Sequence, residues 1–154
     1  MNGSCRFGLW YIHVWWDEDT VYRVRFARDP LEGNVPAAIT RYLAGNATDM
    51  GDLHSAATGP DTQYSHIYRE VQEVPYGITA TYGDIARKVG TSPRLVGLAM
   101  KRNPTPLLVP CHRVVAKDCL GGFTPDIGIK VQLLALERKT LKKYGRIEKG
   151  RIST

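Results

Sequence analysis

The hydrophobic pattern of this chain changes once, near residue 62, and that change limits the folds open to it. Apolar and aromatic side chains fill residues 5–15 and 20–27, with alternation in the second run, and the acidic Asp17-Glu18-Asp19 between them predicts a hairpin. From residue 64 onward apolar residues recur three or four positions apart, which is helical spacing. The sequence therefore predicts an α+β chain, with a β-rich part followed by a helical part.

We place the boundary between two small domains after residue 60. Residues 1–60 hold the predicted strands, one short helix over 35–44 that Gly45-Asn46 ends, and a linker rich in small polar residues. Residues 61–154 hold the remaining helices. A chain of 154 residues is long enough to bury a core in such an arrangement.

Two short helices in the second part form the outline of a helix-turn-helix. Thr81 and Asp84 match a capping box at the start of the first helix, and Gly90 ends it. Ser92-Pro93 then matches the cap and first position of a second helix, which runs to about residue 102. This motif is typical of DNA-binding proteins, although helix pairs with such turns are also common outside them.

Small residues on the second helix leave two interpretations open. Gly97 and Ala99 would let another molecule approach the helix closely, or let the helix pack tightly against a neighbour.

A final helix is predicted from Thr124-Pro125-Asp126 onward, because a cap, a proline and an acidic residue occur in that order. Its buried stripe is expected at four apolar positions, namely Ile127, Val131, Leu134 and Leu141, and Leu133 and Leu136 are expected to widen it.

Positive charge is concentrated at one end of the chain. Residues 138–154 carry a net charge of +6, which equals the net charge of the whole protein, so residues 1–137 are neutral overall. Basic segments suit phosphate contacts, and we expect this tail to add non-specific affinity for DNA. A solvated helix end explains the same residues equally well.

The three cysteines, Cys5, Cys111 and Cys119, form no CxxC pair and no even-numbered framework. We therefore expect free thiols, no metal site and no cofactor. The sequence has no apolar run long enough to cross a bilayer and no signal-peptide pattern at its start. These features predict a cytoplasmic protein without membrane contact.

One motif carries chemistry. Pro110-Cys111-His112-Arg113-Val114 lies between two strand-like apolar runs, about ten residues after the helix-turn-helix outline. A thiol is a good nucleophile only as the thiolate, and an imidazole takes the thiol proton best when a carboxylate fixes its tautomer. Glu137 on the last helix supplies a carboxylate. Because neighbours on an extended chain point to opposite sides, we expect Cys111 and His112 to communicate through a water molecule.

This set resembles the signature of the O6-alkylguanine-DNA alkyltransferases, with Asn103-Pro104 upstream and Lys130 and Leu133-Leu134 downstream. The resemblance covers about residues 64–137. It implies that Cys111 accepts the alkyl group of O6-alkylguanine, or of O4-alkylthymine, in one irreversible turnover. It also implies catalytic roles for His112 and Glu137, for Tyr82 as the group that protonates the leaving base, and for Asn103 as the residue that holds the cysteine turn.

The same resemblance implies that a monomer binds alkylated double-stranded DNA through the minor groove and flips the damaged base outward. Arg94 would then take the place of the flipped base. Further residues at the DNA would be Thr91, Ser92, Gly97, Ala99 and Arg102. The residues around the alkyl group and base would be Met100, Arg113, Val114, Val115, Phe123 and Thr124. Many members have Gly-Gly before the last helix where this chain has Pro125-Asp126, which predicts a stiffer pocket rim and leaves open whether bulky alkyl groups fit.

Three alternatives remain. A lesion sensor of the same fold would bind damaged DNA without chemistry, but relatives of that kind lack the reactive cysteine. A helix-turn-helix transcription regulator would leave Cys111, His112 and Glu137 unexplained. A cysteine hydrolase would need an oxyanion hole and a peptide cleft, and the sequence indicates neither.

Overall fold

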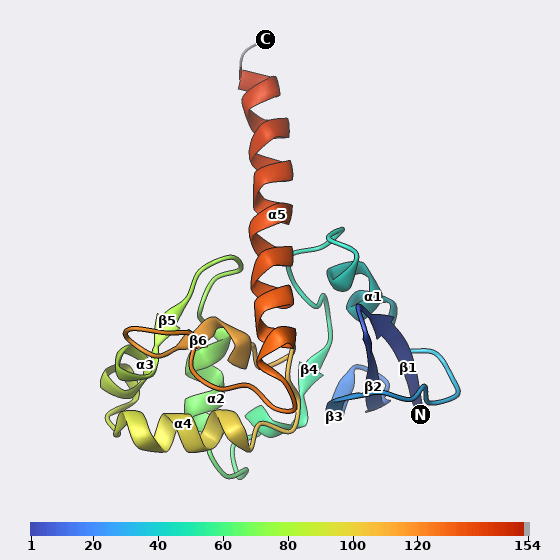
Figure 1. Ribbon diagram of the computed structural model, residues 1–154. Helices are drawn as coiled ribbons and strands as arrows, with labels where there is room; N and C mark the ends of the chain where they lie inside the picture. Colours follow the sequence, from blue (N-terminus) through green and yellow to red (C-terminus); the bar gives the residue numbers. More distant parts are fainter. Residues whose placement is uncertain (153–154) are drawn as a thin grey trace.

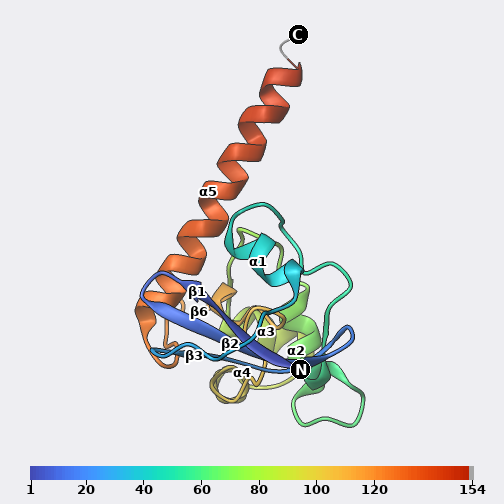
Figure 2. The same cartoon turned by 90° about the vertical axis from the view of Figure 1, so that its right-hand side faces the viewer.

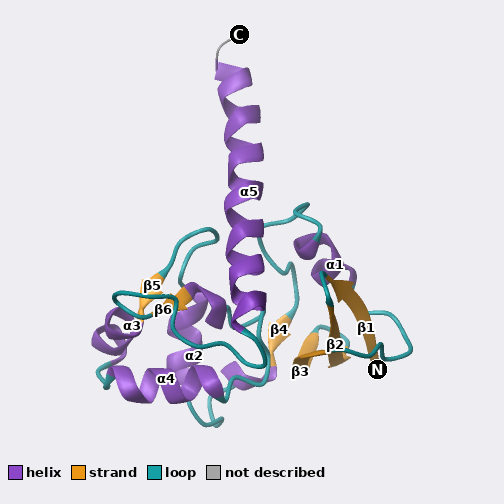
Figure 3. Cartoon of the chain, in the orientation of Figure 1, coloured by secondary structure: helices purple, strands orange, loops and turns teal. Residues whose placement is uncertain are grey.

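The protein is described by a computed structural model, which covers the backbone of residues 1–152 and the side chains of residues 1–145. A four-stranded sheet lies on one side of the molecule and most helices lie on the other, with the last helix rising between them (Figure 3). The sheet has the order β1-β2-β3-β4, with β1 (Asn2–Phe7), β2 (Trp10–Asp17) and β3 (Thr20–Ala27) antiparallel and β4 (His54–Ser55) parallel to β3. The mixture of sheet and helices confirms the α+β prediction.

The hairpin around Glu18 is confirmed, but the single strand expected over residues 5–15 is wrong. That stretch contains two strands, β1 and β2, joined by a turn at Gly8, whose φ is +61°. Because apolar and aromatic residues continue on both sides of this tight turn, the hydrophobic pattern did not mark it. Only the glycine, which adopts a positive φ without steric cost, signalled the reversal.

The expected short helix is present as α1 (Ala37–Leu43), and Gly45 follows it at φ +75°. A single 3₁₀ turn, η1 (Ala56–Thr58), then leads to α2 (Ser65–Gln72). The buried residues of α2 include Ile67, Tyr68 and Val71, as their helical spacing predicted.

The helix-turn-helix is confirmed in detail. It follows the short strand β5 (Ala80–Thr81) and consists of α3 (Tyr82–Val89) and α4 (Pro93–Lys101), which pack against each other. Thr81 and Asp84 form the predicted capping box, and Gly90 ends α3 at φ +82°. The Ser92 hydroxyl accepts a hydrogen bond from the Leu95 N–H at 3.2 Å, which caps α4.

The segment before the reactive motif is not the strand that its apolar residues suggested. Residues 105–110 form buried turns in which Leu107 adopts φ +78°, and Cys111–Arg113 form one 3₁₀ turn, η2. Only the run after the motif is a strand, β6 (Val114–Val115), which pairs in parallel with β5. Short buried turns and buried strands have the same apolar composition, so periodicity cannot separate them.

The last helix, α5 (Ile127–Ile152), begins two residues later than predicted. Asp126 rather than Thr124 acts as its cap, because the Asp126 carboxylate accepts a hydrogen bond from the Gly128 N–H at 2.7 Å.

The predicted buried stripe of α5 is also wrong for three of its four main positions, whereas Leu133, which was expected to widen it, is completely buried and Leu136 is half-buried. Ile127, Val131 and Leu141 are 41%, 44% and 39% exposed, and only Leu134 is buried. The buried face is centred instead on Leu133 and also includes Ile129, Lys130, Glu137 and Thr140. Two of these side chains are charged, so this face is missing from the hydrophobic pattern.

The basic C-terminal part of α5 projects away from the body of the molecule, at the end opposite to α4 (Figures 1 and 2). Helix α4 and the backbone of residues 146–152 therefore lie at opposite ends of the protein. The side chains of Arg146, Lys149 and Arg151 lie outside the described residues, and the DNA affinity of the tail stays a prediction. Across residues 1–152, no helix combines the length and apolar character required to span a bilayer.

Two hydrophobic cores hold the chain together, and one of them mixes both parts of the sequence. The core under the sheet combines Ile12 and Ile39 with Leu107, Ile129 and Leu133 from far downstream. The second core lies among α2, α3 and α4. The boundary at residue 60 stays a prediction, and the first core extends across it.

Leu133 and Leu141 offer a matched test of which face of α5 is buried. Leu133→Ala should lower the free energy of unfolding by about 2–5 kcal/mol, because its side chain is completely buried. Leu141→Ala on the exposed face should cost well under half of that. Urea denaturation of both variants measures the difference, and equal losses would contradict the assignment of the buried face.

Candidate functional site

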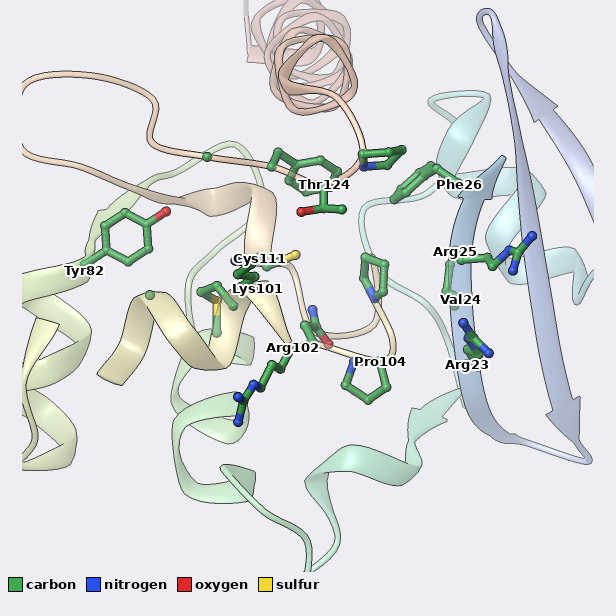
Figure 4. Close-up of a pocket in the computed structure, with 17 residues that line it drawn as sticks. Arg23, Val24, Arg25, Phe26, Tyr82, Lys101, Arg102, Pro104, Cys111 and Thr124 are labelled. Atoms are coloured by element: carbon green, nitrogen blue, oxygen red, sulfur yellow. The ribbon is translucent and has the colours of Figure 1, made fainter. Parts of the chain in front are cut away.

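A pocket of about 710 Å³ separates the edge of β3 from α4. Figure 4 shows its lining residues, with Tyr82 on one side, β3 on the other and the sulfur of Cys111 between them. Residues 23–26 of β3, the end of α4 and the loops 103–106 and 122–125 form its walls. The pocket therefore lies where the two parts of the chain meet.

Cys111 is the first residue of η2 and contributes to the pocket wall. Burial raises the pKa of its thiol, while a hydrogen bond with Asn103 and the positive charge of Lys130 partly oppose that effect. At neutral pH the resting group is therefore a thiol, and a base has to take its proton before it can attack carbon.

Asn103 holds the backbone that leads into the cysteine turn. Its side-chain amide donates to the Val109 carbonyl at 2.9 Å, and its carbonyl oxygen accepts from the Thr105 N–H at 3.0 Å. These two bonds bracket the segment in which Leu107 adopts a positive φ. The geometry agrees with the holding role that the resemblance implied for Asn103.

Behind the pocket wall, His112 forms a buried pair with Glu137. Nε2 of His112 lies 2.6 Å from Oε2 of Glu137, and burial lowers the pKa of the imidazole. Nδ1 of His112 is buried and has no hydrogen-bond partner within the part of the chain whose side chains are described. In that part no hydrogen bond joins the Cys111 thiol to the His112 ring, as we expected, although the two residues lie on a 3₁₀ turn and not on an extended strand.

The Glu137 carboxylate accepts hydrogen bonds from several segments. Arg113 donates to it from Nε at 2.9 Å, and the Gly77 N–H donates to it at 2.8 Å. Burial alone would raise the pKa of Glu137, but hydrogen bonds from His112 and Arg113 hold it well below its usual range. Glu137 is therefore a carboxylate, and it makes Nε2–H the favoured tautomer of His112, which leaves Nδ1 free to accept a proton.

Sequence reasoning missed Tyr42, which reaches this pair from α1. Its hydroxyl donates to Oε2 of Glu137 and lies 3.2 Å from Nε2 of His112. No motif surrounds Tyr42, and a lone tyrosine in a short helix has no signal that distinguishes it from a packing residue.

Lys130 was part of the motif, but the sequence indicated no role for it. Its side chain is completely buried, and Nζ donates to the Val114 carbonyl at 2.7 Å and to the Gly122 carbonyl at 3.3 Å. The lysine thus ties the strand after the cysteine turn to the pocket loop and adds a positive charge near the thiol.

Tyr82 lies at the pocket opposite β3, as a leaving-group acid requires. Burial and the neighbouring Cys111 raise the pKa of its phenol, so the hydroxyl keeps its proton at neutral pH. A Cβ added to Gly121 would lie 2.7 Å from this hydroxyl, so the glycine leaves room for it.

The residues expected at the DNA lie on α4, at its two ends, or in the turn before it. Arg94, Ser92 and Arg102 are exposed, and a Cβ added to Gly97 would meet no atom within 4 Å. Thr91 is partly exposed in the turn before α4. The prediction that Ala99 contacts DNA is wrong, because its side chain is completely buried in the core that α4 shares with α2. The two interpretations of small residues therefore separate, with Gly97 open to an approaching molecule and Ala99 packed.

Three of the six residues that we expected around the alkyl group and base line this pocket, and the binding of a base there stays a prediction. Met100, Phe123 and Thr124 line the pocket. Arg113, Val114 and Val115 do not, because η2 turns them away from it. Arg113 is buried against Glu137 and the Val74 carbonyl, Val114 is completely buried, and Val115 pairs with Thr81.

The N-terminal strand β3 supplies a pocket wall that the sequence did not indicate. Val24 and Phe26 face the core side of the sheet, and the Val24 N–H donates to the Pro104 carbonyl at 2.8 Å. Phe26 also packs against Phe123 with ring centroids 5.7 Å apart. An alternating strand carries no local sign of which distant loop its edge will border, so this wall could not be predicted.

A thiol in a pocket wall, backed by a histidine–carboxylate pair and placed beside a helix-turn-helix, is the arrangement expected of a DNA-binding protein with a cysteine nucleophile. Residues 62–139 match the family model described as the 6-O-methylguanine DNA methyltransferase DNA-binding domain. The matched region includes both helices of the helix-turn-helix, the Pro-Cys-His-Arg-Val motif and Glu137.

Individual relatives extend this match. A methylated-DNA–protein-cysteine methyltransferase of Archaeoglobus fulgidus is 32% identical over 144 residues, which cover 91% of this chain and 92% of the relative. One of Metallosphaera sedula is 42% identical over 104 residues, covering 68% of this chain and 66% of the relative. A DNA base-flipping protein of Thermus thermophilus is 42% identical over 112 residues, covering 72% of this chain and 76% of that protein.

The fold is also similar to a solved structure. Mycobacterium tuberculosis OGT in complex with DNA superposes with a TM-score of 0.69 at 28% identity, covering 84% of this chain and 88% of that one. Together with the family model, these matches show that the chain belongs to the 6-O-methylguanine DNA methyltransferase family.

The Glu137 carboxylate gives stability a defined pH dependence. Its folded-state pKa lies below its unfolded value of about 4.3, so its contribution is present above that pH and is lost as the pH falls further. Glu137→Gln should therefore cost about 3–5 kcal/mol at pH 7, because it leaves Arg113 buried without its counter-charge. The deficit relative to the unaltered protein should shrink below about pH 4.

Urea denaturation at pH 7 and at pH 3 measures this change. Glu73→Gln, which alters an exposed carboxylate, is the matched control and should leave stability nearly unchanged at pH 7. A Glu137→Gln deficit of the same size at both pH values would contradict the proposed charge state.

Proposed function

We propose that this protein repairs DNA by transferring the alkyl group of O6-alkylguanine to the sulfur of Cys111. The observation that carries the proposal is the position of this thiol, which stands in the wall of an open pocket directly in front of the buried His112–Glu137 pair. The proposal includes O4-alkylthymine as a second substrate and a monomer acting in the cytoplasm.

The chemistry follows from the groups around the pocket. The thiol proton passes through a water molecule to Nδ1 of His112, and Nε2–H remains bound to Glu137. The thiolate then attacks the alkyl carbon, a carbon–sulfur bond forms, and the bond between that carbon and O6 breaks. The electron pair stays on guanine, which receives a proton from the Tyr82 hydroxyl as it leaves. Because the resulting thioether is stable in water and no described residue near Cys111 supplies a group that can reverse the step, each molecule reacts once.

The DNA has to present the base outside the duplex, because the thiol is recessed in a pocket. We propose that α4 lies in the minor groove, with the open surface at Gly97 against the sugar–phosphate backbone. Arg94, exposed at the start of α4, would fill the place of the extruded base. The pocket is wide and is bounded on one side by β3, which supports entry of a whole nucleobase.

A lesion sensor is the second candidate, because the base-flipping protein of Thermus thermophilus is as similar in sequence as one of the methyltransferases. A sensor would use the same helix-turn-helix and pocket but would transfer nothing. The presence of Cys111 beside the buried His112–Glu137 pair favours transfer. Only a transferase becomes covalently alkylated, so the mass of the Cys111 peptide distinguishes a transferase from a sensor.

Incubation with duplex DNA containing O6-methylguanine should add one methyl group to Cys111. Peptide mass spectrometry should find Cys5 and Cys119 unmodified, since neither stands before a histidine–carboxylate pair. Cys111→Ser should abolish transfer and still bind DNA. Loss of the lesion with an unmodified Cys111, or repair by Cys111→Ser, would contradict the mechanism, and binding without transfer would favour the sensor.

Arg94→Ala should slow repair of duplex DNA much more than it slows the reaction of Cys111 with free O6-benzylguanine. The free base needs no extrusion, so it does not use the arginine. Arg87→Ala, which removes an exposed arginine from α3, serves as the matched control for lost surface charge. Equal losses of Arg94→Ala on both substrates would contradict the extrusion role.

A further inference from the structure

We propose that Tyr42, which belongs to the N-terminal half, is a positioning residue for the proton relay of Cys111. Its hydroxyl holds His112 in the tautomer that can accept the thiol proton and stabilises the imidazolium that forms. This inference deepens the proposed function and rests on it, since it assigns a residue outside the family motif to the same site.

The geometry around the hydroxyl is specific. Tyr42 is 1% exposed, and its hydroxyl donates to Oε2 of Glu137 while its oxygen lies 3.2 Å from Nε2 of His112. Nε2 and Oε2 themselves lie 2.6 Å apart. The three polar atoms therefore form a closed triangle, in which each group touches the other two.

The direction of each proton in this triangle follows from the charges. Glu137 is a carboxylate and can only accept, so both the tyrosine O–H and the imidazole Nε2–H point toward it. The oxygen lone pairs of Tyr42 are then directed toward the Nε2–H side of His112. The negative end of the hydroxyl dipole thus lies beside the ring that becomes positive when Nδ1 takes the thiol proton. Burial and the Glu137 charge raise the pKa of Tyr42 well above its usual value, so the hydroxyl keeps the proton that this arrangement needs.

The other charged and titratable groups near His112 do not replace this contribution. Arg113 from η2 and Lys130 from α5 both lower the pKa of the ring, because like charges oppose the imidazolium. Glu137 from α5 raises it, and Cys111 is the proton donor. Tyr76 packs its ring at 88° against the Tyr42 ring, and its own hydroxyl has no hydrogen bond to either member of the pair. Tyr42 is therefore the one neutral hydroxyl, among the described residues, that touches both His112 and Glu137.

The anchoring of Tyr42 explains why the N-terminal half would matter for chemistry. Helix α1 is fixed by Ile39 and Tyr42 in the core beneath the sheet, together with Ile129 and Leu133 of α5. Glu137 is two turns further along the same face of α5 as Ile129 and Lys130. The core that joins α1 to α5 thus also sets the position of the hydroxyl relative to the carboxylate.

Alkylation of Cys111 by iodoacetamide tests this role without DNA, so its result is distinguishable from a failure of the proposed function. The rate reports the thiolate fraction, and peptide mass spectrometry separates Cys111 from Cys5 and Cys119. Tyr42→Phe should move the midpoint of the rate–pH profile to higher pH by about one unit, which lowers the rate about tenfold below the midpoint. Well above the midpoint the variant and the unaltered protein should react at the same rate. The control is Tyr76→Phe, which removes a neighbouring hydroxyl without a bond to the relay and should leave the profile unchanged.

Each outcome of this experiment decides for or against the proposal. An unchanged profile in folded Tyr42→Phe would overturn it, and so would an equal loss at every pH, which indicates structural damage alone. If Tyr42→Phe does not fold, the imidazole ¹⁵N spectrum of the unaltered protein decides instead. The proposal expects His112 to carry its proton on Nε2 with Nδ1 unprotonated, and a proton on Nδ1 would overturn it.

Discussion

The buried Glu137 carboxylate is the interaction on which the rest of this structure depends. A lone charge at zero exposure would be strongly destabilising, so the protein surrounds it with donors from three other segments, including the guanidinium of Arg113. These donors can reach the carboxylate only when α1, the turn at Gly77, η2 and α5 are all in place. Folding of both halves of the chain and assembly of the site are therefore one physical requirement.

The single 3₁₀ turn η2 places Cys111 and His112 in two different environments. On one side the Cys111 sulfur faces an open pocket, and on the other the His112 ring is shielded from water among charged and hydroxyl groups. Burial keeps both the thiol and the imidazole neutral at rest. A nucleophile that is formed only on demand would suit the single turnover that we propose, because a permanently ionised thiol would be exposed to other electrophiles in the meantime.

The sequence predicted those parts of the fold that local rules determine. The capping box at Thr81, the helix end at Gly90 and the cap at Ser92 each act within a few residues, and all three are present. The predicted buried face of α5 was wrong at several positions, because that face includes the charged side chains of Lys130 and Glu137, which a hydrophobic pattern does not mark. Predictions also failed where the chain returns from a distance, because nothing near Tyr42 or Phe26 indicates the loops and helices that they meet.

Counting turnovers tests the central claim most directly. With O6-methylguanine duplex in large excess over protein, the lesions removed should reach a plateau at about one per molecule, because each reaction converts the Cys111 thiol into a thioether that the site cannot reopen. Continued removal beyond one lesion per molecule would contradict the account, and so would removal of none by protein that still binds the duplex.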